Sequence, residues 1–177
     1  MIELARRDPG RAVVGVELSF KRVLKLARRL SRSDLRNVRL LGVDAAWAVR
    51  EAFDDESVES FWINFSDPWP KRRHQRRRLI EPEFVGELSR RLIPGGSLHV
   101  VTDDPDYAAA IRSALEVERL LKNTQAADSH PSDRRELPPT AFEREWAAQR
   151  RACFFFQYRR VKTIAASRSG QPSRVAS

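Results

Sequence analysis

The stretch VESFWINFSDPWPKRRHQRRR, residues Val58–Arg78, places a predicted strand, a rigid turn and a run of positive charge next to one another. Val58 to Phe65 is apolar and rich in aromatic and β-branched residues, which is typical of a strand. The prolines of Asp67-Pro68-Trp69-Pro70 end that strand, and six of the next eight residues, Lys71–Arg78, are Lys or Arg. We call Lys71–Arg78 the basic block. A carboxylate and an aromatic ring beside a phosphate-binding surface predict a protein that acts on a base within a nucleic acid.

Strand and helix patterns alternate along the rest of the chain. Apolar runs predict strands, and apolar residues at helical spacing predict the helices that follow them. The predicted strands cover 12–17, 38–43, 58–65, 97–102 and 153–161, the predicted helices cover 20–30, 45–53, 83–92, 107–115 and 140–151, and Pro94-Gly95-Gly96 is a predicted turn. This alternation indicates an α/β fold with a mostly parallel sheet and helices on both faces. We expect one domain over 1–164, with a polar loop over 125–139 and a disordered tail over 165–177.

An acidic residue follows each of the first four predicted strands: Glu17, Asp44, Asp67 and Asp103. In open α/β sheets, ligands bind beyond the carboxyl ends of the strands, and a carboxylate there commonly accepts hydrogen bonds from ribose hydroxyls. Taken singly, Asp44 is better explained as a helix N-cap and Glu17 as the polar end of a strand. Together the four carboxylates predict a site for a nucleoside-containing cofactor.

Composition narrows the class of protein. The 177 residues include 33 Lys and Arg against 24 Asp and Glu, a formal charge of +9, which favours a polyanionic partner, above all a nucleic acid. No stretch approaches the roughly 20 apolar residues of a membrane span, and the N-terminus lacks the apolar core of a signal peptide. One cysteine and three histidines offer no metal-ligand spacing. We therefore expect a cytoplasmic protein without a metal or a membrane contact.

Several motifs, in order, resemble one family. They are G-V-E at 15–17, F-S-D-P-W-P-K-R-R-H at 65–74, R-R-L at 77–79, P-G-G at 94–96, V-T-D at 101–103 and T-A-F-E at 140–143. From about residue 2 to residue 162 the chain resembles the tRNA (guanine-N7)-methyltransferases, bacterial class I enzymes with a Rossmann-like sheet. The resemblance implies methyl transfer from S-adenosylmethionine to N7 of guanosine 46 in the tRNA variable loop.

The resemblance also implies roles for individual residues. Glu17, Asp44 and Asp67 match residues that hold the cofactor, and Asp67 also has the catalytic position. The matches to substrate-binding residues are Lys71, Asp103, Thr140, Ala141, Phe142 and Glu143, and the RNA-contacting stretch matches Arg73, His74, Gln75, Arg76, Arg77 and Arg78. Without the resemblance, 140–143 is equally well explained as a capping box, and a basic run as a solvated face.

Two departures from the family keep alternatives open. The family has Lys where Ala141 stands, and its first strand and glycine-rich turn, which lie in the middle of the sheet, should precede residue 1. We expect that the sequence is shortened by a misplaced start or a split gene. The alternatives are a catalytically impaired tRNA-binding remnant, an exocyclic-amino methyltransferase, because Asp67-Pro68-Trp69 partly resembles that loop, and a basic scaffold protein. Nothing in the sequence indicates the oligomeric state.

Overall fold

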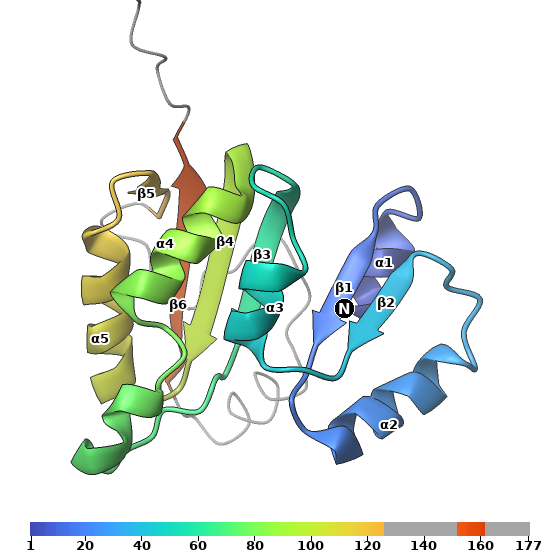
Figure 1. Cartoon of the computed structure of the whole chain (residues 1–177), viewed down its shortest axis with the longest axis horizontal. Helices are drawn as coiled ribbons and strands as arrows, with labels where there is room; N and C mark the ends of the chain where they lie inside the picture. Colours follow the sequence, from blue (N-terminus) through green and yellow to red (C-terminus); the bar gives the residue numbers. More distant parts are fainter. Residues whose placement is uncertain (126–151, 162–177) are drawn as a thin grey trace, which may run out of the picture.

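Helices and strands alternate in the computed structural model, which describes residues 1–125 and 152–161 (Figure 1). The elements are α1 (Ile2–Arg7), β1 (Val13–Val16), α2 (Phe20–Leu30), β2 (Val38–Leu41), α3 (Ala45–Glu51), β3 (Val58–Asn64), the 3₁₀ helix η1 (Arg72–Arg77), α4 (Pro82–Arg91), β4 (Leu92–Thr102), α5 (Pro105–Glu116), β5 (Leu121–Asn123) and β6 (Phe154–Arg160). Beyond residue 125 the structure describes the last strand, and the predicted loop, helix and tail of that part of the chain lie outside the described residues.

The described strands form two sheets. One has the order β3-β4-β6-β5 and the other consists of β1 and β2. The pairs β1–β2 and β3–β4 are parallel, whereas β6 runs antiparallel to both of its neighbours, so β6 is the reversed strand of its sheet. The arrowheads of β1, β2 and β4 point to the same end of the molecule in Figure 1. The predicted mostly parallel arrangement is therefore confirmed for the described strands.

A break separates the two sheets between β1 and β3. Among the described residues, β1 pairs with β2 alone and β3 pairs with β4 alone, so the edges of β1 and β3 that face each other in Figure 1 lack a ladder of backbone hydrogen bonds. An ion pair between Arg11 Nη1 and Glu59 Oε2, at 3.1 Å, spans the break. Both side chains are at least half exposed, and such pairs contribute about 0 to 1 kcal/mol. The break lies between β2 and β1 on one side and β3, β4, β6 and β5 on the other.

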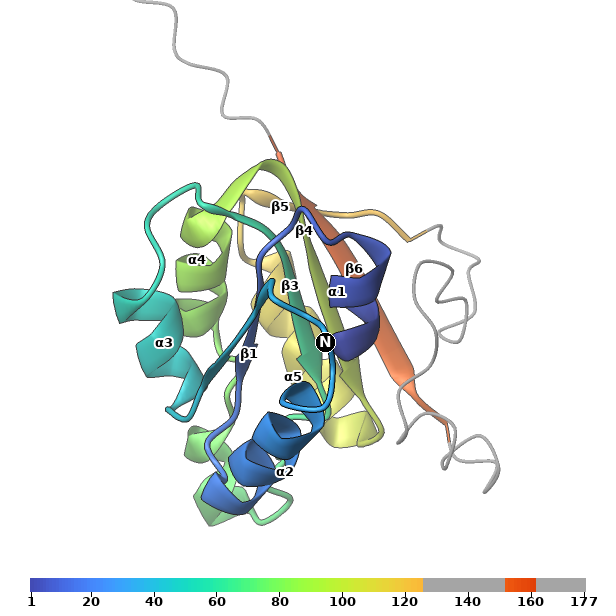
Figure 2. The same ribbon diagram turned by 90° about the vertical axis from the view of Figure 1, so that its right-hand side faces the viewer.

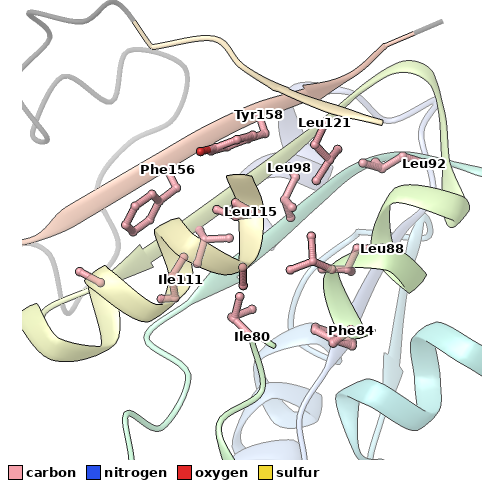
Figure 3. Close-up of a cluster of buried hydrophobic side chains, with 14 of the residues drawn as sticks. Ile80, Phe84, Leu88, Leu92, Leu98, Ile111, Leu115, Leu121, Phe156 and Tyr158 are labelled. Atoms are coloured by element: carbon pink, nitrogen blue, oxygen red, sulfur yellow. The ribbon is translucent and has the colours of Figure 1, made fainter. Parts of the chain in front are cut away.

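One hydrophobic core lies between the four-stranded sheet and helices α4 and α5 (Figure 3). Leu88 from α4, Leu98 from β4 and Ile111 and Leu115 from α5 are fully buried in it, and Phe156 of β6 closes it. Complete burial stabilises a leucine-sized side chain by roughly 1.5 to 3 kcal/mol, so this cluster fixes α5 and the end of β4 firmly. Helix α1 lies on the other side of the strands from α3 and α4 (Figure 2), which places helices on both faces.

Local sequence explains where the helices begin. The Asp44 carboxylate accepts the Trp47 N–H at 2.9 Å and caps α3, and the Asp104 carboxylate accepts the Tyr107 N–H at 2.7 Å and caps α5. Helices α4 and α5 also begin with Pro82 and Pro105, whose fixed backbone angle suits the first helical turn. The predicted helices over 20–30 and 45–53 are confirmed, the second ending at Glu51.

The predicted turn at Pro94-Gly95-Gly96 is wrong, because these residues belong to β4. They form a β-bulge. Val58 and Ser60 of β3 pair with Leu92 and Ser97 of β4, so more residues lie between the two paired positions on β4 than on β3. A Cβ on Gly96 would lie 2.9 Å from two backbone oxygens, those of Glu59 and Ile93, so only glycine fits. Sequence reasoning also missed η1 and β5, because a basic run and a three-residue strand carry little apolar periodicity.

Candidate active site and nucleic-acid interface

The four predicted carboxylates lie at one edge of the strand array. Glu17, Asp44, Asp67 and Asp103 each come one to three residues after the end of β1, β2, β3 and β4. The carboxyl ends of these strands lie together at the lower end of the molecule in Figure 1. We call this end the carboxyl edge. The break in the strand array separates Glu17 and Asp44 from Asp67 and Asp103.

Glu17 and Asp44 hold their own loops in place. Glu17 is half-buried; its carboxylate accepts the Ser19 N–H at 2.8 Å and lies 3.6 Å from Arg22 Nη1. Asp44 is exposed, and its Oδ1 caps α3 as described above. The N-cap interpretation of Asp44 is therefore confirmed. An N-cap uses one carboxylate oxygen, so this structural role is compatible with a second one.

Asp67 lies in a strained turn. The residues on either side of the turn, Phe65 and Trp69, have φ angles of 52° and 44°, a left-handed conformation that costs bulky residues about 1 to 3 kcal/mol each. Asp67 Oδ1 accepts the Trp69 N–H at 3.0 Å, whereas its carboxylate is exposed and its Oδ2 has no partner in the described part of the chain. The Phe65 N–H donates to the Val101 carbonyl at 2.9 Å, which ties the turn to β4. Backbone strain of this kind is concentrated at functional sites.

Tyr107 joins the two ends of the segment that follows β3. Its hydroxyl accepts the Ile80 N–H at 3.0 Å and lies 3.3 Å from Ser66 Oγ. The side chain is fully buried, and this burial raises the pKa of Tyr107 above its ordinary value of 10.0, against smaller lowering contributions from its hydrogen bonds and from Arg78. The Arg78 guanidinium lies 5.0 Å from the centre of the Tyr107 ring, and its Nε donates to the Pro68 carbonyl at 2.8 Å.

Sequence reasoning missed Tyr107 and assigned Arg78 to RNA. The structure gives Arg78 partners inside the protein, in contrast to Arg73 and Arg76, which are exposed, and the RNA contact of Arg78 stays a prediction. The available signal was the position of Tyr107 on the apolar face of the predicted helix over 107–115, which predicts burial but not the partners of the hydroxyl group.

The basic block folds as η1 and stays exposed over Lys71, Arg72, Arg73, Arg76 and Arg77. His74 meets the half-buried Trp69 ring edge to face, with centroids 5.7 Å apart, and the Arg77 guanidinium lies 5.1 Å from that ring. Within residues 1–125 and 152–161, no side chain of the block forms an ion pair with a carboxylate, although Arg11, Arg50, Arg90, Arg91 and Arg160 elsewhere do. The positive charge of the block is therefore not neutralised by the described protein.

Asp103 is half-buried directly after β4, and its carboxylate has no partner among the described residues. The predicted substrate residues Thr140, Ala141, Phe142 and Glu143 lie outside the described part of the chain. No group of three His, Cys, Asp or Glu side chains within that part could hold a metal ion. None of the described helices has the length and apolarity required to cross a bilayer.

The chain matches known methyltransferases in sequence. A family model with the description "Putative methyltransferase" matches residues 1–156. The chain is 36% identical over 162 residues to a tRNA (guanine-N(7)-)-methyltransferase of Thermotoga maritima, which is 92% of this chain and 50% of that protein. It is 42% identical over 142 residues to the protein of that name from Bordetella pertussis, covering 80% of this chain and 54% of that protein. The chain thus spans about half the length of these curated relatives.

Solved structures share the fold at low sequence identity. The [4+2]-cyclase SpnF has a TM-score of 0.56 at 16% identity, covering 92% of this chain and 70% of its own. The aminoglycoside resistance methyltransferase NpmB1 has a TM-score of 0.55 at 16% identity, covering 90% of this chain and 81% of its own. These similarities show the Rossmann-like fold of class I methyltransferases, as the sequence predicts, and at this identity they carry no information about the substrate.

Proposed function

We propose, from the premise that this chain belongs to the tRNA (guanine-N7)-methyltransferase family, that it takes part in methyl transfer from S-adenosylmethionine to N7 of guanosine 46 in tRNA. The observation that carries the proposal is the position of the basic block, which begins four residues after Asp67 and forms no ion pair with a carboxylate in the described residues. A polyanion bound there is held beside the carboxyl edge, where the fold class binds its ligands. Such a protein acts in the cytoplasm, with tRNA as its partner.

The carboxylates of this edge fit the proposed cofactor. Glu17 and Asp44 follow neighbouring parallel strands, and Asp67 presents an oxygen without a partner in the described residues. Carboxylates at such positions accept hydrogen bonds from ribose hydroxyls and compensate positive charge. S-adenosylmethionine, when bound, supplies an electrophilic methyl group on a sulfonium ion. Glu17 and Asp44 would hold its nucleoside part, and Asp67 would lie at the junction between cofactor and base.

The proposed chemistry requires positioning from this chain, not deprotonation. Guanine N7 carries a lone pair and no proton, so a general base is unnecessary, and alignment of the reacting atoms removes several kcal/mol of the barrier. The Asp103 carboxylate, which has no partner in the described residues, would accept from the N1–H and N2–H₂ edge of guanine. Adenine lacks that pair of donors, so Asp103 would select guanine.

The remaining contacts divide between base and phosphates. Lys71 and the segment 140–143, Thr140, Ala141, Phe142 and Glu143, would contact the substrate nucleotide. The block from Arg73 to Arg77, including His74, Gln75 and Arg76, would bind tRNA phosphates, because exposed guanidinium groups form bidentate pairs with phosphate oxygens. For Arg78 we propose the different role developed below.

The break in the sheet favours one second candidate function. The edges of β1 and β3 carry backbone donors and acceptors without ladder partners in the described residues, and an additional strand between them would satisfy these groups. Without that strand, a tRNA-binding remnant that has lost catalysis is the alternative. Calorimetric titration separates the two functions, because the remnant retains tRNA and loses S-adenosylmethionine.

The test of the proposed function is the identity of the modified nucleoside. The protein is incubated with S-adenosylmethionine and unmodified tRNA, and the digested nucleosides are analysed by mass spectrometry. We expect 7-methylguanosine, its loss in Asp67→Ala with tRNA retention preserved, and its persistence in Asp54→Ala, an exposed carboxylate beyond the opposite ends of the strands. Methylation of an exocyclic amino group, or unchanged turnover in Asp67→Ala, contradicts the proposal.

A further inference from the structure

Asp67 lies between two residues that other parts of the fold hold in place. Ser66 Oγ contacts the Tyr107 hydroxyl at 3.3 Å, and the Pro68 carbonyl accepts from Arg78 Nε at 2.8 Å. Asp67 itself makes one hydrogen bond in the described structure, to the Trp69 N–H two residues away. The direction of its carboxylate is therefore set by the contacts of its neighbours.

Those contacts work against backbone strain. Phe65 and Trp69 have positive φ angles, and such residues keep that conformation only where the surroundings enforce it. The Phe65 N–H is held by Val101 of β4, but the centre of the turn is held by Tyr107 and Arg78. Removal of either contact should allow the turn to relax.

Tyr107 is a rigid anchor for this purpose. It is fully buried in the core, and its own N–H binds Asp104, the N-cap of α5, at 2.7 Å. Asp103, the proposed base-selecting residue, directly precedes this cap. The same hydroxyl also accepts the Ile80 N–H at the far end of the basic block. The Tyr107 hydroxyl therefore links both ends of the segment from Ser66 to Ile80, and the Tyr107 backbone ties this link to the start of α5 next to Asp103.

Arg78 differs from the other arginines of the block. Its guanidinium stacks over the Tyr107 ring, and its Nη2 is buried without a hydrogen-bond partner among residues 1–125 and 152–161, whereas Arg73 and Arg76 are exposed. In this position the Arg78 side chain contacts the turn through Pro68 and the ring of Tyr107. Its planar group is matched to a carbonyl on one side and an aromatic face on the other, which the ammonium of lysine does not reproduce.

We propose that Tyr107 and Arg78 are positioning residues that clamp the Phe65–Trp69 turn, and thereby aim the Asp67 carboxylate and hold the basic block in register beside it. The assignment rests on the proposed function for its effect on turnover. The clamp itself is independent of that function and is tested separately below.

The clamp is tested by limited proteolysis with trypsin, because the block offers cleavage sites that are cut when the segment opens. We expect Tyr107→Phe to accelerate cleavage within Lys71–Arg78 about tenfold, since the Ile80 N–H loses its acceptor. The matched control is Tyr158→Phe, which removes a buried hydroxyl that has no hydrogen-bond partner in the part of the chain that the structure describes. Arg78→Lys should also accelerate cleavage, and Arg76→Lys, at an exposed site of the same block, should not. Equal rates in Tyr107→Phe and Tyr158→Phe, read by mass spectrometry of the fragments, overturn the clamp whether or not the protein is active.

Turnover then tests whether the clamp orients the Asp67 carboxylate for catalysis. We expect the kcat of Tyr107→Phe and Arg78→Lys to fall about 100-fold while the KM for tRNA changes less than about threefold, because misplacement by about 1 Å costs that much in rate. A merely destabilising change would also lower the apparent kcat at constant KM by reducing the active fraction, so kcat is normalised to the folded fraction measured by circular dichroism, and Tyr158→Phe controls for the loss of a buried hydroxyl. Faster cleavage with unchanged kcat overturns the positioning role. Absence of turnover in the unaltered protein counts against the proposed function, and proteolysis alone then decides the clamp.

Discussion

Removal of two exposed charges from the basic block should weaken tRNA binding in a way that depends on salt. We choose the double substitution Arg73→Gln and Arg76→Gln, because both side chains are exposed and neither has an ion-pair partner in the described residues. Each phosphate contact contributes about 0.7 to 0.9 to the slope of log K against log salt, so the slope should decrease by about 1.4 to 1.8. Extrapolated from about 1 M to about 0.15 M salt, this corresponds to roughly 20-fold weaker binding.

The assay is tRNA binding by fluorescence anisotropy between about 0.05 and about 0.2 M salt. The matched control is Arg50→Gln with Arg90→Gln, which removes the same charge from two arginines that are paired with Glu83 and with Asp55 and Glu87. We expect the control to leave the slope within about 0.3 of the unaltered value. Equal slope changes in both double variants would show that net charge, and not a local phosphate site, determines binding, and would refute the assignment of the block.

Three further outcomes follow from the described contacts. Gly96→Ala should lower the free energy of unfolding by about 1 to 3 kcal/mol, because the new Cβ would clash with two backbone oxygens. Gly42→Ala is the control, since a Cβ there would make only ordinary van der Waals contacts. In the same thermal unfolding experiment it should change the free energy of unfolding by less than about 1 kcal/mol. Because burial raises the pKa of Tyr107, its hydroxyl ionises more readily in the unfolded chain than in the folded one. The contribution of Tyr107 to stability is therefore present below pH 10 and is lost as the pH rises further. Urea titrations at increasing pH should show that the free energy of unfolding falls more steeply for the unaltered protein than for Tyr107→Phe. Asp44→Ala should lower the free energy of unfolding by about 1 kcal/mol, because the N-cap of α3 is lost. Asp44→Asn should keep that stability but bind S-adenosylmethionine more weakly in calorimetry. An affinity for S-adenosylmethionine that neither substitution changes would restrict Asp44 to its role as a cap.

Elements with strong periodicity could be predicted from the sequence, and elements made by long-range contacts could not. The helix Phe20–Leu30 and the strand Val58–Asn64 follow from apolar spacing within a few residues, and the structure confirms them. The bulge at Pro94-Gly95-Gly96 was predicted as a turn, since Pro and Gly usually interrupt a strand. That segment stays in β4 because β3 pairs with it on both sides of the bulge.

In the candidate site, too, some residues could be predicted from the sequence, whereas contacts between distant segments could not. Strand ends can be read along the chain, so Glu17, Asp44, Asp67 and Asp103 were found without coordinates, and the fold brings all four to the carboxyl edge. Their roles stay predictions. No pattern in the sequence relates Tyr107 to Ser66, which is 41 positions away, because a hydrogen bond between distant segments has no local signature.

The sequence by itself determined the alternation of strands and helices, the acidic residue after each of the first four strands and the basic block that follows the Asp67 turn. Each of these depends on side chains that are neighbours along the chain. Only the tertiary structure decided that the strands separate into two sheets, that Arg78 turns inward to Pro68 and Tyr107, and that the turn around Asp67 is strained. The physical reason is that hydrogen bonds, ring contacts and backbone strain of this kind arise when distant segments pack together, and the free energy that fixes them comes from the shared core beneath them.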